Sequence, residues 1–355
     1  MTLDAGGTNF VFSAVKGAKE IIEPVRLASN ANDLKLCLET IIMGFESVKN
    51  KLNEVPVAIS FAFPGPADYV NGIIGDLGNL PAFRGGVALG PMLKQHFNMP
   101  VFINNDGDLF AYGEAIFGML PALNHQLAHL GIKKCFHNLI GVTLGTGFGG
   151  GLVRNQNLII GDNGAAGEVW LLRNPLLNNS FAEESISARA VTIEYQNQTG
   201  LIVDNITPLD VYQIAKGLNP GNKNAALKAF DSLGFALGTI LSDLITVFDA
   251  PVVIGGGLAD AYDLFAPKMM EQLKRSFNDR KNNPVACLEV QALNMEDPGF
   301  VKTLEAYSSK QVKVPFSDKL VNYNPTKWVA VGNSKLGTSN AVALGAYAFA
   351  LNAIA

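Results

Sequence analysis

The chain has 355 residues, of which 48% are hydrophobic, and its formal net charge is −4. This length predicts about two domains, with ample apolar material for two cores. The acidic balance, with a pI near 5.6, excludes the basic surface that binders of nucleic acid or anionic membranes need. Cys37, Cys135 and Cys287 are too far apart for a disulfide framework or a metal motif. There is no signal peptide and no apolar run of about 18 residues, so we expect a cytoplasmic protein without membrane or nucleic-acid partners.

The chain begins with a short strand and a glycine turn. Residues 3–22 read "LDAGGTNFVFSAVKGAKEII": a strand, a Gly-Gly-Thr turn, an apolar strand, a basic polar turn and a third strand. Only three residues precede Asp4, so the first strand is expected to be very short. Asp4 either caps the glycine turn or holds a hard cation.

Strand and helix patterns alternate after this hairpin. Residues 33–48 repeat apolar side chains at helical spacing behind Asp33, which predicts an amphipathic helix with an aspartate N-cap. Buried strands are predicted in "VAISFAFPGP", in "PVFINND" and in "LIGVTLGTG". The alternation favours an α/β fold with helices packed on sheets.

Five glycines stand among the seven residues from Gly145 to Gly151. Glycine weakens a strand by roughly 0.5–1 kcal/mol relative to alanine, so such a run needs a reason. It either makes a tight hairpin at a crowded junction or lets bare backbone surround a phosphate. Neither the P-loop pattern nor GxGxxG followed by a helix occurs here.

The two glycine hairpins repeat each other. A shift of 138 residues lays the first over the second, so that Gly7, Thr8 and Phe10 match Gly145, Thr146 and Phe148. Lys16 then matches Arg154. The same order of strands and turns at two places in the chain predicts duplicated lobes.

Residues 219–260 predict a capped long helix, an Ala-Pro break, a strand and a third glycine turn, and residues 338–353 predict a terminal helix. Three glycine turns, each at a strand end, resemble the nucleotide site of the actin-like sugar kinase fold. The chain resembles the ROK family of sugar kinases and sugar-responsive repressors more closely, through "DAGGTN", "FPGPAD", "GNLP", "NND", "LGTGFGGG" and "GAAGE" in that order. The resemblance covers nearly the whole chain except residues 285–330.

The resemblance implies an α/β fold of the two-lobed actin-like ATPase (ribonuclease H-like) sugar kinase type, with duplicated lobes and a central cleft. Residues 1–117 and 338–355 are expected to form the N-terminal lobe, and residues 118–337 the C-terminal lobe. The implied activity is ATP- and Mg²⁺-dependent phosphorylation of glucose, fructose, mannose or an N-acetylhexosamine at the primary hydroxyl, by a homodimer. A non-catalytic sugar-binding or regulatory relative is the alternative. A repressor of the family would carry a DNA-binding segment before the first phosphate loop, where this chain begins.

Phosphoryl transfer needs a carboxylate beside the acceptor hydroxyl. Asp106, between a strand end and a helix start in "INNDGDLFAYGEAIFG", resembles the family's catalytic base. Taken alone, this segment favours helix capping by Asp106 or Asp108, whereas the motif order favours catalysis and leaves the structural role to Asp108. Asp4 resembles the family's metal-side residue, which orients Mg²⁺ and its waters, and the second hairpin has Val142 in its place.

The resemblance also assigns the remaining ligands. Those expected to bind ATP are Gly6, Gly7, Thr8, Asn9, Gly145, Thr146, Gly147, Gly255, Gly256 and Gly257. Those expected to bind the sugar are Gly65, Asn79, Asn105, Asp106, Glu168 and Glu183.

The chain departs from the family after Glu168. The family has a histidine three residues after this glutamate, followed by zinc-binding cysteines and a second glutamate. Here Leu171 replaces the histidine, and no cysteine lies between Cys135 and Cys287. Glu183 matches the second glutamate by its spacing to Ser187 and Arg189, with Glu184 as its competitor and a solvated acidic pair as the plain alternative.

We therefore predict that the purified protein contains no structural zinc. Residues 169–182 hold neither cysteine nor histidine, and tetrahedral zinc needs such ligands. Inductively coupled plasma mass spectrometry is expected to find far less than one zinc per chain. One tightly held equivalent would contradict the alignment of this segment.

Overall fold

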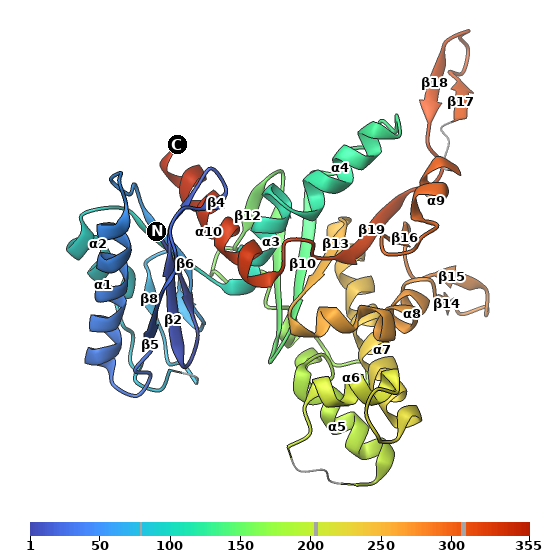
Figure 1. The fold of residues 1–355 in the computed structure, drawn as a ribbon. Helices are drawn as coiled ribbons and strands as arrows, with labels where there is room; N and C mark the ends of the chain where they lie inside the picture. The colour runs from blue at the N-terminus through green and yellow to red at the C-terminus, as the bar shows by residue number, and fades with distance from the viewer. Residues whose placement is uncertain (79, 202–204, 307–309) are drawn as a thin grey trace. The chain divides into compact units, whose positions relative to one another are not determined.

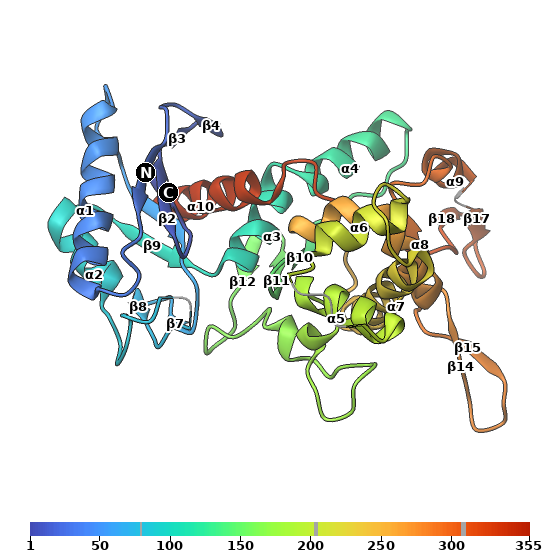
Figure 2. The same cartoon turned by 60° about the horizontal axis from the view of Figure 1, so that its bottom comes forward.

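The computed structural model describes residues 1–78, 80–201, 205–306 and 310–355. The chain folds into two compact α/β units, which Figures 1 and 2 draw in two views. Unit 1 comprises Met1–Pro121, Gly149–Glu168 and Lys335–Ala355, and unit 2 comprises Ala122–Phe148 and Val169–Ser334.

Unit 1 is built on a five-stranded sheet of order β5-β2-β1-β6-β9. Strands β1, β6 and β9 run parallel, whereas β2 is antiparallel to both β1 and β5. The bounds are β1 Thr2–Ala5, β2 Asn9–Ser13, β5 Val25–Ala28, β6 Ile59–Ala62 and β9 Val101–Asn104. Three short hairpins accompany it: β3 Val15–Lys16 with β4 Lys19–Glu20, β7 Ala67–Asp68 with β8 Ile73–Ile74, and β11 Phe148–Arg154 with β12 Asn157–Ile159.

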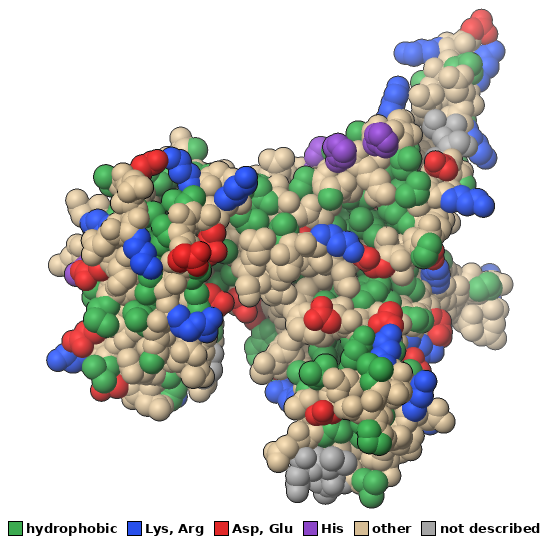
Figure 3. Space-filling model, in the orientation of Figure 1, with side chains coloured by type: hydrophobic (Ala, Val, Ile, Leu, Met, Phe, Trp, Pro, Cys, Tyr) green, Lys and Arg blue, Asp and Glu red, His purple; other side chains and the backbone are tan. Residues whose placement is uncertain are grey.

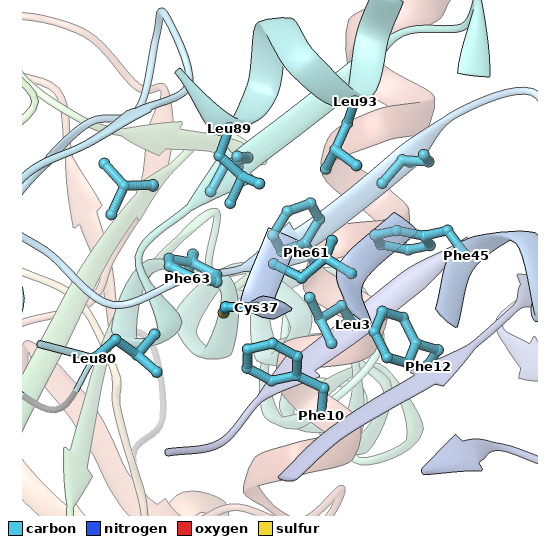
Figure 4. Close-up of a cluster of buried hydrophobic side chains, with 14 of the residues drawn as sticks. Leu3, Phe10, Phe12, Cys37, Phe45, Phe61, Phe63, Leu80, Leu89 and Leu93 are labelled. Carbon is cyan, nitrogen blue, oxygen red and sulfur yellow. The ribbon is translucent and has the colours of Figure 1, made fainter. Parts of the chain in front are cut away.

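Helices α1 (Leu34–Lys51) and α2 (Leu89–Phe97) cover one face of this sheet (Figure 1). Figure 4 shows the core between them, into which alternate residues of β2 and β6 point. Phe45 of α1 makes edge-on contacts with Phe12 and Phe97, with ring centroids 5.2 Å and 6.0 Å apart. The expected aspartate cap of α1 is confirmed, because Asp33 accepts a hydrogen bond of 3.0 Å from the Leu36 amide.

Helices α10 (Thr338–Ile354) and α3 (Asp106–Ile116) pack against each other on the opposite face. Backbone meets backbone at two points of this contact, since a Cβ on Gly113 would collide with the Ala341 carbonyl and one on Gly345 with the Leu109 carbonyl. The first turn of α3 is thereby held close to the sheet by the terminal helix.

Unit 2 contains four parallel strands in the order β10-β13-β19-β16. Helices α7 and α8 of this unit pack so closely that a Cβ on Gly234 or Gly238 would strike the α8 backbone. The strands are β10 Asn138–Leu144, β13 Val252–Gly255, β16 Gln291–Asn294 and β19 Trp328–Asn333, and the helices are α5 Ala188–Thr199, α6 Pro208–Lys216, α7 Lys223–Phe248, α8 Tyr262–Leu273 and α9 Phe300–Ala306. Helix α4 (Met119–His129) begins in unit 1 and continues in unit 2.

Among the described residues, one helix, α7, is long and apolar enough to cross a membrane. Its most apolar window is 61% buried inside the protein. Burial to this extent is typical of the core helix of a globular protein.

Two exposed hairpins stand on either side of α9 in the chain, and the second lies wholly within residues 285–330, which the family resemblance leaves unplaced. They are β14 (Ser276–Asn278) with β15 (Pro284–Ala286), and β17 (Lys310–Lys313) with β18 (Leu320–Tyr323). All residues of β17 and β18 are exposed, and Figure 3 shows lysine side chains along this hairpin.

The predicted repeat of the two hairpins is confirmed, because corresponding residues pair with one another in both copies. Val15 pairs with Glu20 and Lys16 with Lys19 in the first copy, while Val153 pairs with Leu158 and Arg154 with Asn157 in the second. Each pair is displaced by the same 138 residues.

The two units do not coincide with the lobes expected from the sequence, which stay a prediction. Residues 149–168 belong to unit 1, as do residues 118–121 and 335–337, whereas the expected second lobe runs from 118 to 337. The reason for residues 149–168 is the close packing of β11 against the start of α3, where a Cβ on Gly151 would lie 2.8 Å from the Asp108 Cα.

We predict that Gly345→Ala destabilises the protein by about 1–3 kcal/mol, because the added methyl group must separate α10 from α3. In an unconstrained helix the same substitution stabilises by about 1 kcal/mol, so the sign of the effect is decisive. Thermal unfolding measures it. Asn352→Ala, on the exposed end of α10, is the control and is expected to change stability by less than about 0.5 kcal/mol.

Candidate active site

The start of α3 positions the predicted catalytic carboxylate. Strand β9 ends at Asn104, and the extended backbone of Asn105 makes it the N-cap, with its Oδ1 accepting a bond of 2.8 Å from the Gly107 amide. The alternative in which Asp106 or Asp108 is the N-cap of this helix is therefore wrong. Asp106 is the first residue of α3, and its own carboxylate accepts from the Gly107 amide at 2.9 Å.

Asp106 and Asp4 line the same cavity, which has a volume of about 520 Å³ and lies wholly within unit 1. Asp4 reaches it from β1, and the first turn of α10 contributes Thr338, Ser339 and Asn340. Burial raises the pKa of Asp106, and the negative charge of Asp4 raises it further. A higher pKa strengthens a carboxylate as a base, since the base must compete for a proton in the transition state.

The first glycine turn connects β1 to β2 beside this cavity. A Cβ on Gly6 would stand 2.8 Å from the Asn9 carbonyl oxygen, so the turn requires glycine there. Ser29, which follows β5, stabilises this turn. Its hydroxyl donates to the Gly7 carbonyl at 2.6 Å, and its amide donates to the Thr8 carbonyl at 3.0 Å.

The glycines that follow the second turn allow close contact between backbone segments rather than a turn. A Cβ on Gly107 would lie 2.7 Å from the Gly150 carbonyl oxygen, and one on Gly151 would lie 2.7 Å from the Gly107 carbonyl oxygen. Gly167, with φ of 85°, also approaches Gly150, whose carbonyl oxygen would be 3.1 Å from a Cβ at this position. Thus α3, β11 and the segment before Glu168 meet as bare backbone. We call Gly107, Gly150, Gly151 and Gly167 the glycine junction.

Tyr69 connects the predicted sugar ligands of unit 1. Its hydroxyl donates to the Phe63 carbonyl at 3.0 Å and accepts from the Asn105 amide at 3.5 Å. The same hydroxyl lies 3.0 Å from where a Cβ on Gly65 would stand. Burial raises the pKa of Tyr69, and the charges of Asp106, Asp108 and Glu168 raise it further.

The structure thus brings Gly65, Asn105, Asp106 and Glu168 into one neighbourhood, while Asn79 lies outside the described residues. Sequence reasoning missed Tyr69. Its signal was available in "FPGPADY", where a large hydroxyl-bearing side chain follows the predicted end of a buried strand by a few residues.

Asp108 is the most enclosed carboxyl of this neighbourhood, since this residue of α3 is only 6% exposed. Burial raises its pKa to about 8, and the charges of Glu168 and Asp106 contribute. At neutral pH, Asp108 is therefore mainly in its neutral form.

Unit 2 brings the other two glycine turns together. Gly256 has φ of 89°, and its position leaves no room for a Cβ, which would collide with the backbone of Leu144. Since Leu144 directly precedes Gly145, the turn after β13 is packed against the turn after β10. Thr146 at the tip of the latter is exposed.

Glu183 lies against the second glycine turn within unit 2. Its carboxylate accepts a bond of 3.0 Å from the Phe148 amide and forms an ion pair of 3.3 Å with Arg189. The Ala188 amide at the start of α5 donates to the Gly145 carbonyl at 2.8 Å. Glu184, the competing acid, also pairs with Arg189. The bonds from Phe148 and Ala188 fix the turn that contains Gly145.

The segment that would carry the family's zinc ligands is short and partly exposed. Leu171, at the end of the 3₁₀ turn η1 (Val169–Leu171), is 57% exposed. Across the part of the chain that the structure describes, no group of three or more His, Cys, Asp or Glu side chains is arranged to hold a metal ion.

Comparison with known proteins finds relatives along most of the chain. The ROK family model matches residues 1–301. A crystal structure of a glucokinase from Parabacteroides distasonis is 45% identical, covers 99% of this chain and 96% of its own, and has a TM-score of 0.90. A glucokinase from Halalkalibacterium halodurans is 25% identical over 78% of this chain and 84% of its own length. An N-acetyl-D-glucosamine kinase from Vibrio cholerae is 26% identical over 77% and 88%.

We predict that Gly147→Ala destabilises the protein whereas Gly145→Ala does not. A Cβ on Gly147 would stand 2.5 Å from Glu183 Oε2, while nothing lies within 4 Å of one on Gly145. Glu183 can swing away, but the Phe148 amide then loses its acceptor, at a cost of about 1–3 kcal/mol. Chemical unfolding of the two variants measures the difference. Equal stability of both would mean that the Glu183 bond does not hold the turn.

Proposed function

The chain belongs to the ROK family, and we propose that it is a sugar kinase that transfers the γ-phosphate of ATP to the primary hydroxyl of a hexose. The observation that carries the proposal is the shared cavity of Asp4 and Asp106 in unit 1, with a glycine turn beside it. Relatives named as glucokinases and as an N-acetyl-D-glucosamine kinase support the same class of reaction.

Asp106 is the proposed general base. Its carboxylate faces the cavity from the first turn of α3, with one oxygen bonded to the Gly107 amide. It would accept the proton of the sugar's primary hydroxyl as that oxygen attacks the γ-phosphorus in line and ADP leaves. The raised proton affinity that burial and Asp4 give Asp106 favours this transfer.

Phosphate binding is proposed for the three glycine turns. Gly6, Gly7, Thr8 and Asn9 would contact phosphates in unit 1, and Gly145, Thr146 and Gly147 in unit 2, with the adenosine moiety at Gly255, Gly256 and Gly257. Asp4 fits Mg²⁺, because an exposed carboxylate on a cavity wall suits a hard cation that keeps several waters. When bound, Mg²⁺ would neutralise charge on the phosphates.

The proposed sugar ligands are Gly65, Asn79, Asn105, Asp106, Glu168 and Glu183. Acids and amides of this kind discriminate strongly between hydroxyl patterns, because a missing hydroxyl leaves a buried polar group unpaired. Leu171 in place of the family histidine removes one such contact, so the preferred hexose is decided by the remaining ones. We further propose that the enzyme is cytoplasmic and homodimeric and needs no zinc.

The test is a coupled ADP-release assay with ATP and Mg²⁺ over glucose, fructose, mannose and the N-acetylhexosamines. Sugar-stimulated ADP release with at least one of them is expected, and magnetic resonance of the product is expected to place phosphate on the primary hydroxyl. If calorimetry shows sugar binding but no sugar releases ADP, the chain is the non-catalytic sugar-binding relative instead.

We predict that Asp106→Asn retains sugar binding but lowers kcat by about 10²–10⁴. The amide keeps the shape of the side chain and can still accept from the Gly107 amide, but it cannot take the proton. Steady-state kinetics and calorimetry measure the two effects separately.

Asp33→Asn is the matched control, because asparagine caps a helix as well as aspartate does and Asp33 caps the start of α1. It is expected to leave kcat unchanged. A fall of less than about tenfold in kcat for Asp106→Asn, with sugar affinity intact, would assign the base to another residue.

A further inference from the structure

The Asp108 carboxyl has a buried oxygen without a hydrogen-bond partner, although it lies among the proposed sugar ligands. No described residue bonds to its Oδ1, which is shielded from solvent. The carboxyl is enclosed by α3, by β11, where Gly151 approaches the Asp108 Cα, and by the segment that ends at Glu168. A Cβ on Gly167 would stand 3.5 Å from Oδ1, so this oxygen faces the backbone directly before Glu168.

The charges that act on Asp108 are negative. The charges of Asp106 on α3 and of Glu168 in the segment after β12 both raise the pKa of Asp108, while β11 contributes the uncharged Gly150 and Gly151. Tyr69 is a further titratable group that interacts with Asp108, and its hydroxyl is already bonded to Phe63 and Asn105.

Ionised carboxylates accept hydrogen bonds, whereas a protonated carboxyl donates one. A third negative charge in this enclosed place would leave Oδ1 without a donor and would be repelled by two acids, and burying such a charge is costly. Burial accordingly raises the pKa of Asp108 to about 8.

We propose that Asp108 is a positioning residue that works in its neutral form, donating a hydrogen bond to the Gly167–Glu168 segment and so holding Glu168 in place for the sugar. The inference rests on the proposed sugar site, and it assigns to Asp108 a role in substrate affinity rather than in the chemical step.

This role makes sugar affinity dependent on pH. When Asp108 ionises, the donor is lost and three carboxylates repel one another across the glycine junction. If only the protonated form positions Glu168, the apparent dissociation constant rises by the reciprocal of the protonated fraction. For a group with a pKa of about 8, that is about tenfold between pH 7 and pH 9.

The same proton affects folding. Since the native pKa of Asp108 lies above the ordinary value of 3.8, the folded protein keeps a proton that the unfolded chain releases. The contribution of Asp108 to stability is therefore largest at low pH and is lost as pH rises from about 4 to about 8.

The experiment compares wild type with Asp108→Asn, whose amide always donates and never ionises, and with Asp108→Leu, which has similar size and no donor. Calorimetric sugar affinity and KM are measured at pH 7, 8 and 9, with kcat recorded separately. Wild type is expected to lose about tenfold in affinity by pH 9, Asp108→Asn less than about twofold, and Asp108→Leu is expected to bind weakly at every pH with kcat little changed.

Thermal unfolding from pH 5 to pH 8 gives a second readout that needs no substrate. Asp108→Asn is expected to flatten the fall in melting temperature with pH relative to wild type and to the control Asp33→Asn. A tenfold weaker affinity of Asp108→Asn at pH 7, or an unchanged alkaline loss in that variant, overturns the proposal because it shows that the carboxylate form is needed. If no sugar is phosphorylated or bound, the proposed function fails. Separately, if Asp108→Asn leaves the pH dependence of the melting temperature unchanged, Asp108 is not neutral in the folded protein.

Discussion

The close approach of bare backbone at the glycine junction is the constraint on which the site of unit 1 depends. Gly107 and Gly151 each lie where a Cβ would stand 2.7 Å from the other segment's backbone, and Gly167 closes the third side. Any side chain there would separate α3 from β11 and move Asp106 relative to the rest of the cavity. The glycines from Gly145 to Gly151 therefore have two roles. The first ones form a turn, and Gly150 and Gly151 leave room for the start of α3 to approach β11.

The same contact explains the electrostatics. Because α3 is drawn so close to β11 and to the segment before Glu168, the negative charges of Asp106 and Glu168 act on the buried Asp108, and burial is the largest cause of the raised pKa of both aspartates. Their environments still differ. Asp106 opens onto the cavity beside Asp4, which suits a base, whereas Asp108 is enclosed and is left as a neutral donor.

In unit 2 glycine also allows two backbone segments to touch, but no buried aspartate lies at that contact among the described residues. Gly256 packs on the backbone of Leu144, which joins the turn after β13 to the turn after β10. Glu183 then fixes the second turn through the Phe148 amide. The glycine turns of the two units repeat one plan, but unit 2 has Val142 at the position that Asp4 occupies in unit 1.

Local periodicity was enough to predict α1 with its Asp33 cap, the terminal helix, and two hairpins in equal register 138 residues apart. The sequence by itself also determined family membership, through motifs in order. Three features could be read only from the folded chain: which residue caps α3, why residues 149–168 belong to unit 1, and that Tyr69 bonds to the proposed sugar ligand Asn105. These facts depend on contacts between segments far apart in the chain. A local sequence pattern does not show whether a glycine forms a turn or allows two backbone segments to touch. Nor does it show whether an aspartate is exposed to solvent or buried.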